Sequence, residues 1–319
     1  MKTKVLNLHI IIFSLIWGVI LYDVVSGWIG FSYIDEIISL MLFLLWCLFG
    51  NPKKSKEFYF FIAISIFYFV YSLIRPHNIK TAIFMDFFVQ LKPYVAFYSF
   101  YALDFQLKEK QKSHIRKLCI FCSLCLLPIG IVNIGGGPIM DKMGGHARFA
   151  TMNEILAILF IMCSPSTKKN IFISIAMCAV GLFSTRSKMF GFFVLYVFGM
   201  LFGKKLTYKN VFSAKNIFLF TFAFSLLLYV SWFKLDFYFI QGGSNEIMMA
   251  RPLLFYKAYE ILMDYPLFGT GFGSYATEAS AIYHSPIYSQ YDLDLSQEIS
   301  QGLFISDVYF PALAEFGFV

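Results

Sequence analysis

Three arginines stand close to the ends of long apolar segments. Arg148 ends the loop NIGGGPIMDKMGGHARF, Arg186 lies in the short segment FSTRSKM between two apolar runs, and Arg251 begins an amphipathic segment. An arginine side chain is always charged, and its planar set of donors matches the oxygens of a phosphate group. Each of them singly could be an arginine that extends its charge to a membrane surface. Together with Lys188, they suit a phosphate or pyrophosphate that is carried on a lipid.

The segment that begins at Arg251 combines helical periodicity with a glycine-rich turn. Apolar residues recur at helical spacing over residues 251–263, and the sequence PLFGTGFGSY with Gly269, Gly271 and Gly273 follows. The pattern favours a helix that lies on the membrane interface and ends in a turn. The alternative is that the glycines let backbone N–H groups approach an anionic or sugar ligand. A dinucleotide site needs a strand before its glycines, and here a helix precedes them, so we exclude one.

The elements that must position these residues follow from an apolar composition. Of the 319 residues, 59% are hydrophobic and 14% are charged. Soluble domains carry about 25% charged residues, so the composition excludes a water-soluble globular protein and a disordered chain. The net charge of +7 is spread over short basic clusters between apolar runs, which does not suit a nucleic-acid partner. We therefore predict an all-α polytopic integral membrane protein.

The apolar segments predict about nine or ten transmembrane helices. The segments lie at about 5–22, 34–50, 58–74, 83–103, 117–134, 149–164, 171–185, 187–203 and 216–232. A further segment begins near Val308 and reaches Val319, so we expect a span that is cut off there.

Basic clusters predict the orientation of these helices. Cytoplasmic loops are enriched in lysine and arginine, and most of the 26 basic residues fall in alternate connecting segments if the N-terminus is cytoplasmic. Residues 233–307 then form one large outer loop, in which acidic residues outnumber basic ones. We divide the chain into a helix bundle at 1–232, the outer loop at 233–307 and the start of a further helix at 308–319.

Four segments resemble the O-antigen ligase and polymerase superfamily. The most specific is RPLLFYKAYEILMDYPLFGTGFGSY, an arginine before a helix that ends in a Pro-Leu-x-Gly-x-Gly turn. FSTRSKMFGFF is similar to the serine-x-arginine turn of the family, and HARFATMNEILAILF is similar to its helix start with an arginine and then an asparagine. SDVYFPALAEFGFV resembles the segment after the outer loop, which ends in Glu-x-Gly. The order of the segments and the predicted orientation also agree with the family.

The resemblance implies a glycosyltransferase of the bacterial inner membrane that uses neither a metal nor another cofactor. Such enzymes take a glycan from undecaprenyl pyrophosphate at the outer face of the membrane. Polymerases transfer it to another lipid-linked repeat unit, and ligases transfer it to lipid A–core. Arg186 and Arg251 would bind the pyrophosphate and stabilise it as the leaving group. Arg148, Asn153 and Lys188 would add contacts to the substrate.

The chain differs from the family at the residue expected to deprotonate the acceptor hydroxyl. Many ligases have a histidine-asparagine pair where this chain has Ser306 and Asp307. Asp307 could act as the base if burial raised its pKa, and His284 is the other titratable candidate. The missing histidine favours a polymerase of O-antigen or capsule repeat units over a ligase. A flippase is the alternative from another class, although such a carrier should show internal repeats.

The remaining expectations concern binding partners and the residues that could contact a glycan or a lipid. The resemblance implies lipid-linked donor and acceptor glycans, membrane lipid, and a chain-length regulator and a flippase of the same pathway as partners. Asp86 and Lys92 fall within a predicted span, where they could serve polar packing or line a glycan or lipid path. Four tyrosines of the outer loop could stack on sugar rings: Tyr275, Tyr283, Tyr288 and Tyr291.

Overall fold

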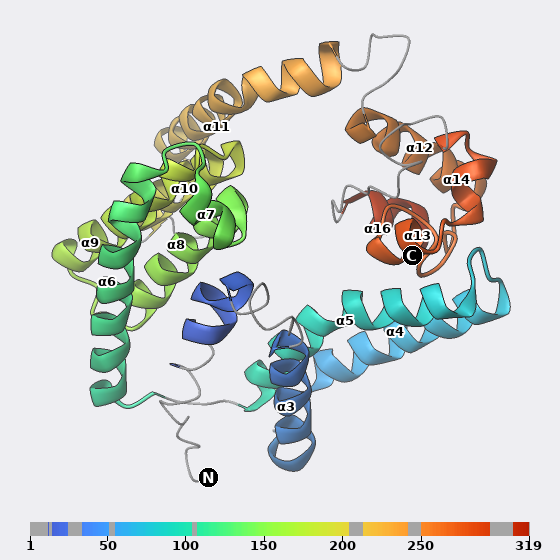
Figure 1. Cartoon of the computed structure of the whole chain (residues 1–319), viewed down its shortest axis with the longest axis horizontal. Coiled ribbons are helices and arrows are strands. Elements are labelled where there is room, and N and C mark those ends of the chain that lie inside the picture. The colour runs from blue at the N-terminus through green and yellow to red at the C-terminus, as the bar shows by residue number, and fades with distance from the viewer. Residues whose placement is uncertain are drawn as a thin grey trace. The chain divides into compact units, whose positions relative to one another are not determined.

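The computed structural model describes the chain except for residues 1–11, 13–14, 25–33, 51–54, 104–106, 204–212, 242–249, 294–308 and 319. Within the described part, every regular element is a helix (Figure 1). The predicted all-α class is therefore confirmed for these residues.

From residue 34 onward, helices occupy the predicted apolar segments. The helices are α3 (Ile34–Phe49), α4 (Lys56–Ile74), α5 (Lys80–Leu103), α6 (Glu109–Val132), α8 (Gly145–Met162), α9 (Lys168–Val180), α10 (Ser187–Phe202), α11 (Ala214–Leu235) and α16 (Tyr309–Phe316). The predicted segment at 5–22 lies mostly outside the described residues, apart from the π-helical turn η1 (Ile16–Ile20).

Two of the described helices, α4 and α6, are long and apolar enough to cross a membrane. Helix α10 is also apolar but shorter. The larger number of spans and the cytoplasmic N-terminus stay predictions.

The chain forms two compact units, each made of two stretches of sequence. Unit 1 comprises residues 1–38 and 105–233, and unit 2 comprises residues 39–104 and 234–319. This division differs from the one based on sequence. The described part of the predicted outer loop packs with α4 and α5 in unit 2.

The core of unit 1 is built around α8. Phe149, Met152, Leu156 and Phe160 recur at the spacing of one helix face, and all four are buried. Polar side chains also join the helices, since Ser174 of α9 donates a hydrogen bond of 2.9 Å to the carbonyl oxygen of residue 157 in α8. The remaining elements of this unit that bear on the site are the short helix α7 (Pro138–Lys142) and the 3-10 turn η3 (Gly181–Ser184).

Unit 2 buries the amphipathic helix that the sequence predicts. This helix, α12 (Ala250–Asp264), packs its residues Leu254, Ala258 and Ile261 against Tyr275 and Ala314. These three residues of the apolar stripe therefore face protein, whereas Phe255 is 50% exposed, and a position of the helix at the membrane interface stays a prediction. The short helices α13 (Glu278–Ile282) and α14 (Pro286–Gln290) follow in the same unit.

Candidate functional site

The glycine turn between α12 and α13 needs glycine because helices pack directly against it. Gly269, Gly271 and Gly273 all have positive φ angles, of 61°, 81° and 70°. A Cβ atom at these positions would lie 2.4 Å, 2.4 Å and 2.9 Å from atoms of α16, α4 and α5, respectively. Left-handed backbone and close approach together explain the three glycines without a ligand.

The backbone N–H groups of this turn bind carboxyl groups of the protein itself. The Gly273 N–H donates to Asp86 Oδ2 over 2.7 Å. The next two N–H groups, of Ser274 and Tyr275, donate to Glu315 Oε1 over 2.9 Å and 3.1 Å. Successive N–H groups that point into one concavity favour an anionic group. The turn was expected to present these groups to a substrate, but α5 and α16 fill the concavity.

One amide connects the two carboxyl groups. Gln90 Nε2 donates to Asp86 Oδ2 over 2.7 Å and to Glu315 Oε2 over 2.9 Å. Asp86 is 2% exposed and Glu315 is fully buried. Buried carboxyl groups need hydrogen-bond partners to offset the loss of water, and the turn and Gln90 provide them. We refer to Asp86, Gln90, Glu315 and their N–H donors as the carboxyl network.

Helix α4 and the connection to α5 hold the turn from its other side. Tyr71 donates to the carbonyl oxygen of Gly269 over 2.9 Å, and Asn78 donates to that of Gly273 over 2.6 Å. Ser72 Oγ accepts the N–H of Phe272 over 2.9 Å. These contacts fix the turn on the α4–α5 pair.

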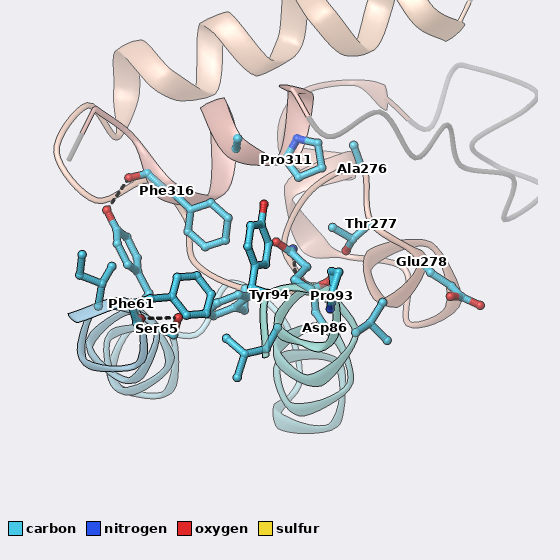
Figure 2. A pocket seen from close by; sticks show the side chains of 17 residues that line it. Phe61, Ser65, Asp86, Pro93, Tyr94, Ala276, Thr277, Glu278, Pro311 and Phe316 are labelled. Atoms are coloured by element: carbon cyan, nitrogen blue, oxygen red, sulfur yellow. Dashed lines mark hydrogen bonds between the residues drawn. The ribbon is translucent and has the colours of Figure 1, made fainter. Parts of the chain in front are cut away.

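A pocket lies beside the carboxyl network, with a cavity volume of about 610 Å³. Side chains of α4 and α5 face the residues around the glycine turn and α16 across it (Figure 2). The lining residues are Phe61, Ile64, Ser65, Tyr68, Asp86, Val89, Gln90, Leu91, Pro93, Tyr94, Phe272, Ala276, Thr277, Glu278, Pro311, Ala312 and Phe316. The lining is therefore mostly apolar and aromatic, and its non-aromatic polar side chains are those of Ser65, Asp86, Gln90, Thr277 and Glu278.

Sequence reasoning did not single out Gln90 or Glu315. The available signal for Glu315 was its place in the Glu-x-Gly ending of SDVYFPALAEFGFV. Of the two roles left open for Asp86, polar packing applies, and the side chain also lines the pocket.

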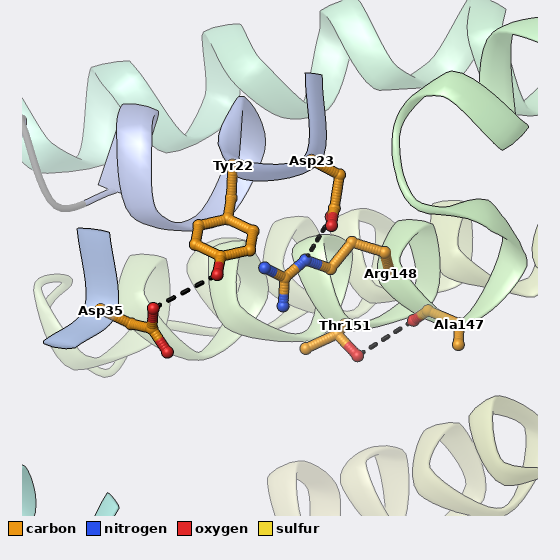
Figure 3. Close-up of polar contacts among 6 residues, drawn as sticks. All are labelled: Tyr22, Asp23, Asp35, Ala147, Arg148 and Thr151. Carbon is orange, nitrogen blue, oxygen red and sulfur yellow. Dashed lines mark hydrogen bonds and ion pairs between the residues drawn. The ribbon is translucent and has the colours of Figure 1, made fainter. Parts of the chain in front are cut away.

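Arg148 already has partners in unit 1. Its Nε atom lies 2.8 Å from Asp23 Oδ2, and its guanidinium carbon lies 4.8 Å from the centre of the Tyr22 ring (Figure 3). Tyr22 in turn donates to Asp35 Oδ1 over 3.2 Å. The Arg148 side chain is 34% exposed, so this ion pair contributes at most about 1 kcal/mol.

Arg186 and Lys188 are exposed at the start of α10. The preceding turn η3 contacts the first turn of α8, which carries Arg148, since His146 Nδ1 lies 3.1 Å from the carbonyl oxygen of Ser184. This contact brings the segments of two predicted arginines together at one end of unit 1. His146 was not a predicted site residue.

Asn153 lies inside unit 1. It is fully buried, and its Nδ2 atom donates to the carbonyl oxygen of Phe149 over 2.9 Å. Its Oδ1 atom has no hydrogen-bond partner among the described residues. The structure therefore places this predicted substrate contact within the packing of α8.

The remaining predicted site residues fall in unit 2. Arg251 is the second residue of α12, and its side chain lies outside the described part. Asp307 also lies outside the described residues. His284 is exposed after α13 with a φ of 44°, and it does not line the pocket. The predicted arginines are thus divided between the two units, and their convergence stays a prediction.

Three of the four outer-loop tyrosines are core residues. Tyr275, Tyr288 and Tyr291 are at most 8% exposed, so the expectation that they stack on sugars is wrong for them. Tyr275 donates to the carbonyl oxygen of Leu254 over 2.5 Å. Tyr283 is half-buried.

The described residues contain no group of three or more histidine, cysteine, aspartate or glutamate side chains that could hold a metal ion. No protein-family model, curated protein or solved structure matches the chain. The family resemblance therefore depends on the four sequence segments alone.

Proposed function

We propose that the protein is a glycosyltransferase of the bacterial inner membrane, which polymerises undecaprenyl-pyrophosphate-linked repeat units at the outer face. The observation that carries this proposal is the position of the three arginines. Arg148 lies in the first turn of α8, Arg186 is the N-cap of α10, and Arg251 is the second residue of α12.

A cation at a helix N-terminus is unfavourable for the helix itself, because the helix dipole is positive at that end. The same position favours an anion, since the N–H groups of the first helical turn are without intrahelical partners and the helix dipole is positive there. Arginines at three helix N-termini therefore support the binding of a pyrophosphate. Lys188 in the first turn of α10 adds to this charge.

The glycine turn gives a second line of support. Gly271 donates its N–H to the backbone oxygen of Glu315 over 2.8 Å, and the Glu315 side chain accepts two further N–H groups. Two of the segments that carry the family resemblance therefore form one structural unit. Shared packing is a physical reason for these two motifs to occur together in one chain.

In the proposed reaction, a hydroxyl at the non-reducing end of one repeat unit attacks the anomeric carbon of another chain. The bond between that carbon and the pyrophosphate oxygen breaks, and its electron pair leaves with the pyrophosphate. Arg186 and Arg251 stabilise the negative charge that develops on the leaving group. A base must take the proton of the attacking hydroxyl.

The deciding experiment is the glycan ladder of a strain in which the gene is deleted. We expect core glycan with a single repeat unit, and a full ladder when the wild-type gene is returned. Loss of all attached glycan would instead indicate a ligase or a flippase. The side of the membrane on which the lipid-linked intermediate accumulates would separate those two. A normal ladder in the deletion strain would contradict the proposed function.

A further inference from the structure

The pocket beside the carboxyl network has two chemically different ends. Asp86, Gln90 and Thr277 lie at one end, while Phe61 and Tyr94 belong to its aromatic part (Figure 2). Asp86 and Tyr94 are eight residues apart on α5, which corresponds to about 12 Å along the helix. A pocket of this length and volume suits a small organic ligand.

The charge of the pocket argues against a pyrophosphate as its occupant. Asp86 and Glu278 line it, and the Glu315 carboxyl group lies directly behind, bridged by Gln90. Among the described residues that line the pocket, none is a lysine or an arginine. An anionic ligand would be repelled there, whereas neutral hydroxyl groups would find acceptors and donors.

The same residues fit a sugar. Carboxyl, amide and hydroxyl side chains can hydrogen-bond to sugar hydroxyls, and aromatic rings can pack against the apolar face of a sugar ring. Tyr94 is 48% exposed, so its ring is accessible for such packing.

We propose that this pocket binds the terminal sugar of the acceptor glycan, and that Asp86 accepts the proton of its attacking hydroxyl. This inference rests on the proposed function. The hydroxyl oxygen bonds to the anomeric carbon of the donor, pyrophosphate leaves with the electron pair of the broken bond, and the proton goes to the Asp86 carboxylate and then to water. Many ligases have a histidine as the base where this chain has Ser306 and Asp307. Asp86 takes the role of that histidine.

The neighbours of Asp86 suit this role. Gln90 donates hydrogen bonds to both Asp86 and Glu315, so the two carboxyl groups are held beside one amide. Gln90 and the Gly273 N–H hold the Asp86 carboxyl group in place, so little reorganisation is needed at the moment of proton transfer.

The test is Asp86→Asn, expressed in the deletion strain from the full-length gene. Asparagine has nearly the same shape, and its oxygen can accept the Gly273 N–H and the Gln90 amide that now bind Asp86 Oδ2. The turn should therefore stay in place while the base is lost. We expect at least a 100-fold loss of polymer with an unchanged amount of protein in the membrane. Full polymer with Asp86→Asn would overturn the inference.

Asn78→Ala is the matched control for the position of the turn. Asn78 does not line the pocket, but it donates a hydrogen bond to the carbonyl oxygen of Gly273, and this variant removes that bond. We expect a smaller loss than with Asp86→Asn. An equal loss in both variants, with reduced protein in the membrane, would assign Asp86 to packing and overturn its role as a base.

Substitution of Tyr94 tests whether the pocket binds a sugar, and it leaves the residues of the carboxyl network unchanged. Tyr94→Ala should lower polymer formation by purified protein about tenfold at limiting lipid-linked repeat unit, and Tyr94→Phe, which keeps the ring, should lose less activity than Tyr94→Ala. Free repeat-unit oligosaccharide, released from the lipid by mild acid, should compete with the reaction, and a prenol should not. Competition by the prenol alone would overturn the inference in favour of a lipid site.

These outcomes separate the inference from the proposed function. If the deletion strain lacks polymer and Asp86→Asn restores it, only the inference fails. If the deletion strain makes normal polymer, the proposed function fails, and the inference fails with it.

Discussion

The two units handle polar groups in opposite ways. Unit 1 exposes Arg186 and Lys188 at the start of a helix, whereas unit 2 buries Asp86 and Glu315 under a glycine turn. Exposed charged side chains contribute little to stability. Buried carboxyl groups hold the backbone together, and they remain functional only where they reach a pocket. Substitution of the exposed cations of unit 1 should therefore change activity without changing stability. Substitution of the buried carboxyl groups of unit 2 should change both.

The largest effect is expected from Gly269→Ala in unit 2. The new Cβ atom would lie 2.4 Å from the backbone carbon of Glu315, and φ is 61°. Strain and clash together should lower the free energy of unfolding by about 3 kcal/mol or more. Thermal unfolding in detergent measures this change.

Gly145→Ala in unit 1 is the matched control. Its φ is 77°, but a Cβ atom there meets nothing within 4 Å. We expect a loss of about 1 kcal/mol from the left-handed backbone alone. Equal losses at the two glycines would show that close packing of α16 does not explain Gly269.

Arg186→Ala should produce the next largest effect, on activity alone. We expect at least a 100-fold loss of polymer, which corresponds to about 2.7 kcal/mol of transition-state stabilisation. Its melting temperature should stay within about 1 °C of the wild type, because the side chain is exposed.

Arg116→Ala in α6 serves as a control, since this arginine lies in a segment that the sequence predicts to be cytoplasmic. It should leave the glycan ladder complete. Arg251→Ala should lose polymer as Arg186→Ala does. Full polymer with either Arg186→Ala or Arg251→Ala would contradict the assigned roles.

Tyr288→Phe should destabilise unit 2 by about 1–2 kcal/mol. The Tyr288 hydroxyl lies 2.7 Å from Ser280 Oγ and accepts the N–H of Ala276 over 3.1 Å. The variant leaves the buried Ala276 N–H without its acceptor, whereas Ser280 Oγ keeps its hydrogen bonds to Thr277. Stability unchanged by the substitution would contradict the description of Tyr288 as a core residue.

The pH dependence of stability sharpens the same test. Burial raises the pKa of Tyr288 from 10.0 to about 12. The folded state thus holds the phenol proton more tightly than the unfolded state does. This stabilisation is present below pH 10 and is lost as the pH rises toward 12. The loss of stability between pH 10 and pH 12 should be smaller in Tyr288→Phe than in the wild type.

Asp23→Ala should have the smallest effect. It removes the ion pair with Arg148, which is worth at most about 1 kcal/mol at this exposure. If Arg148 also contacts the substrate, the substitution should alter polymer formation less than Arg148→Ala does. The glycan ladders of the two variants, compared at equal protein level, measure the difference.

The positions of the helices and several of their ends can be predicted from the order of residues alone. Apolar runs predicted the positions of the helices from residue 34 onward, and helical spacing followed by Pro266 predicted α12 to within two residues. Periodicity and helix-breaking residues act locally, so they can be read along the chain. The same local patterns indicated a turn at the three glycines.

What these elements contact depends on tertiary packing. Leu254, Ala258 and Ile261 of α12 pack against Tyr275 and Ala314, which lie at least 14 positions away in the sequence. Asn153 and Tyr288 are buried, although their residue types also suit a ligand contact. The side chains of Gln90 and Glu315 meet although 225 positions separate them. Local periodicity shows that a face is apolar, but it does not identify the distant segment that covers it. The carboxyl network, whose partners come from α5, α16 and the glycine turn, therefore exists only once these segments have packed together.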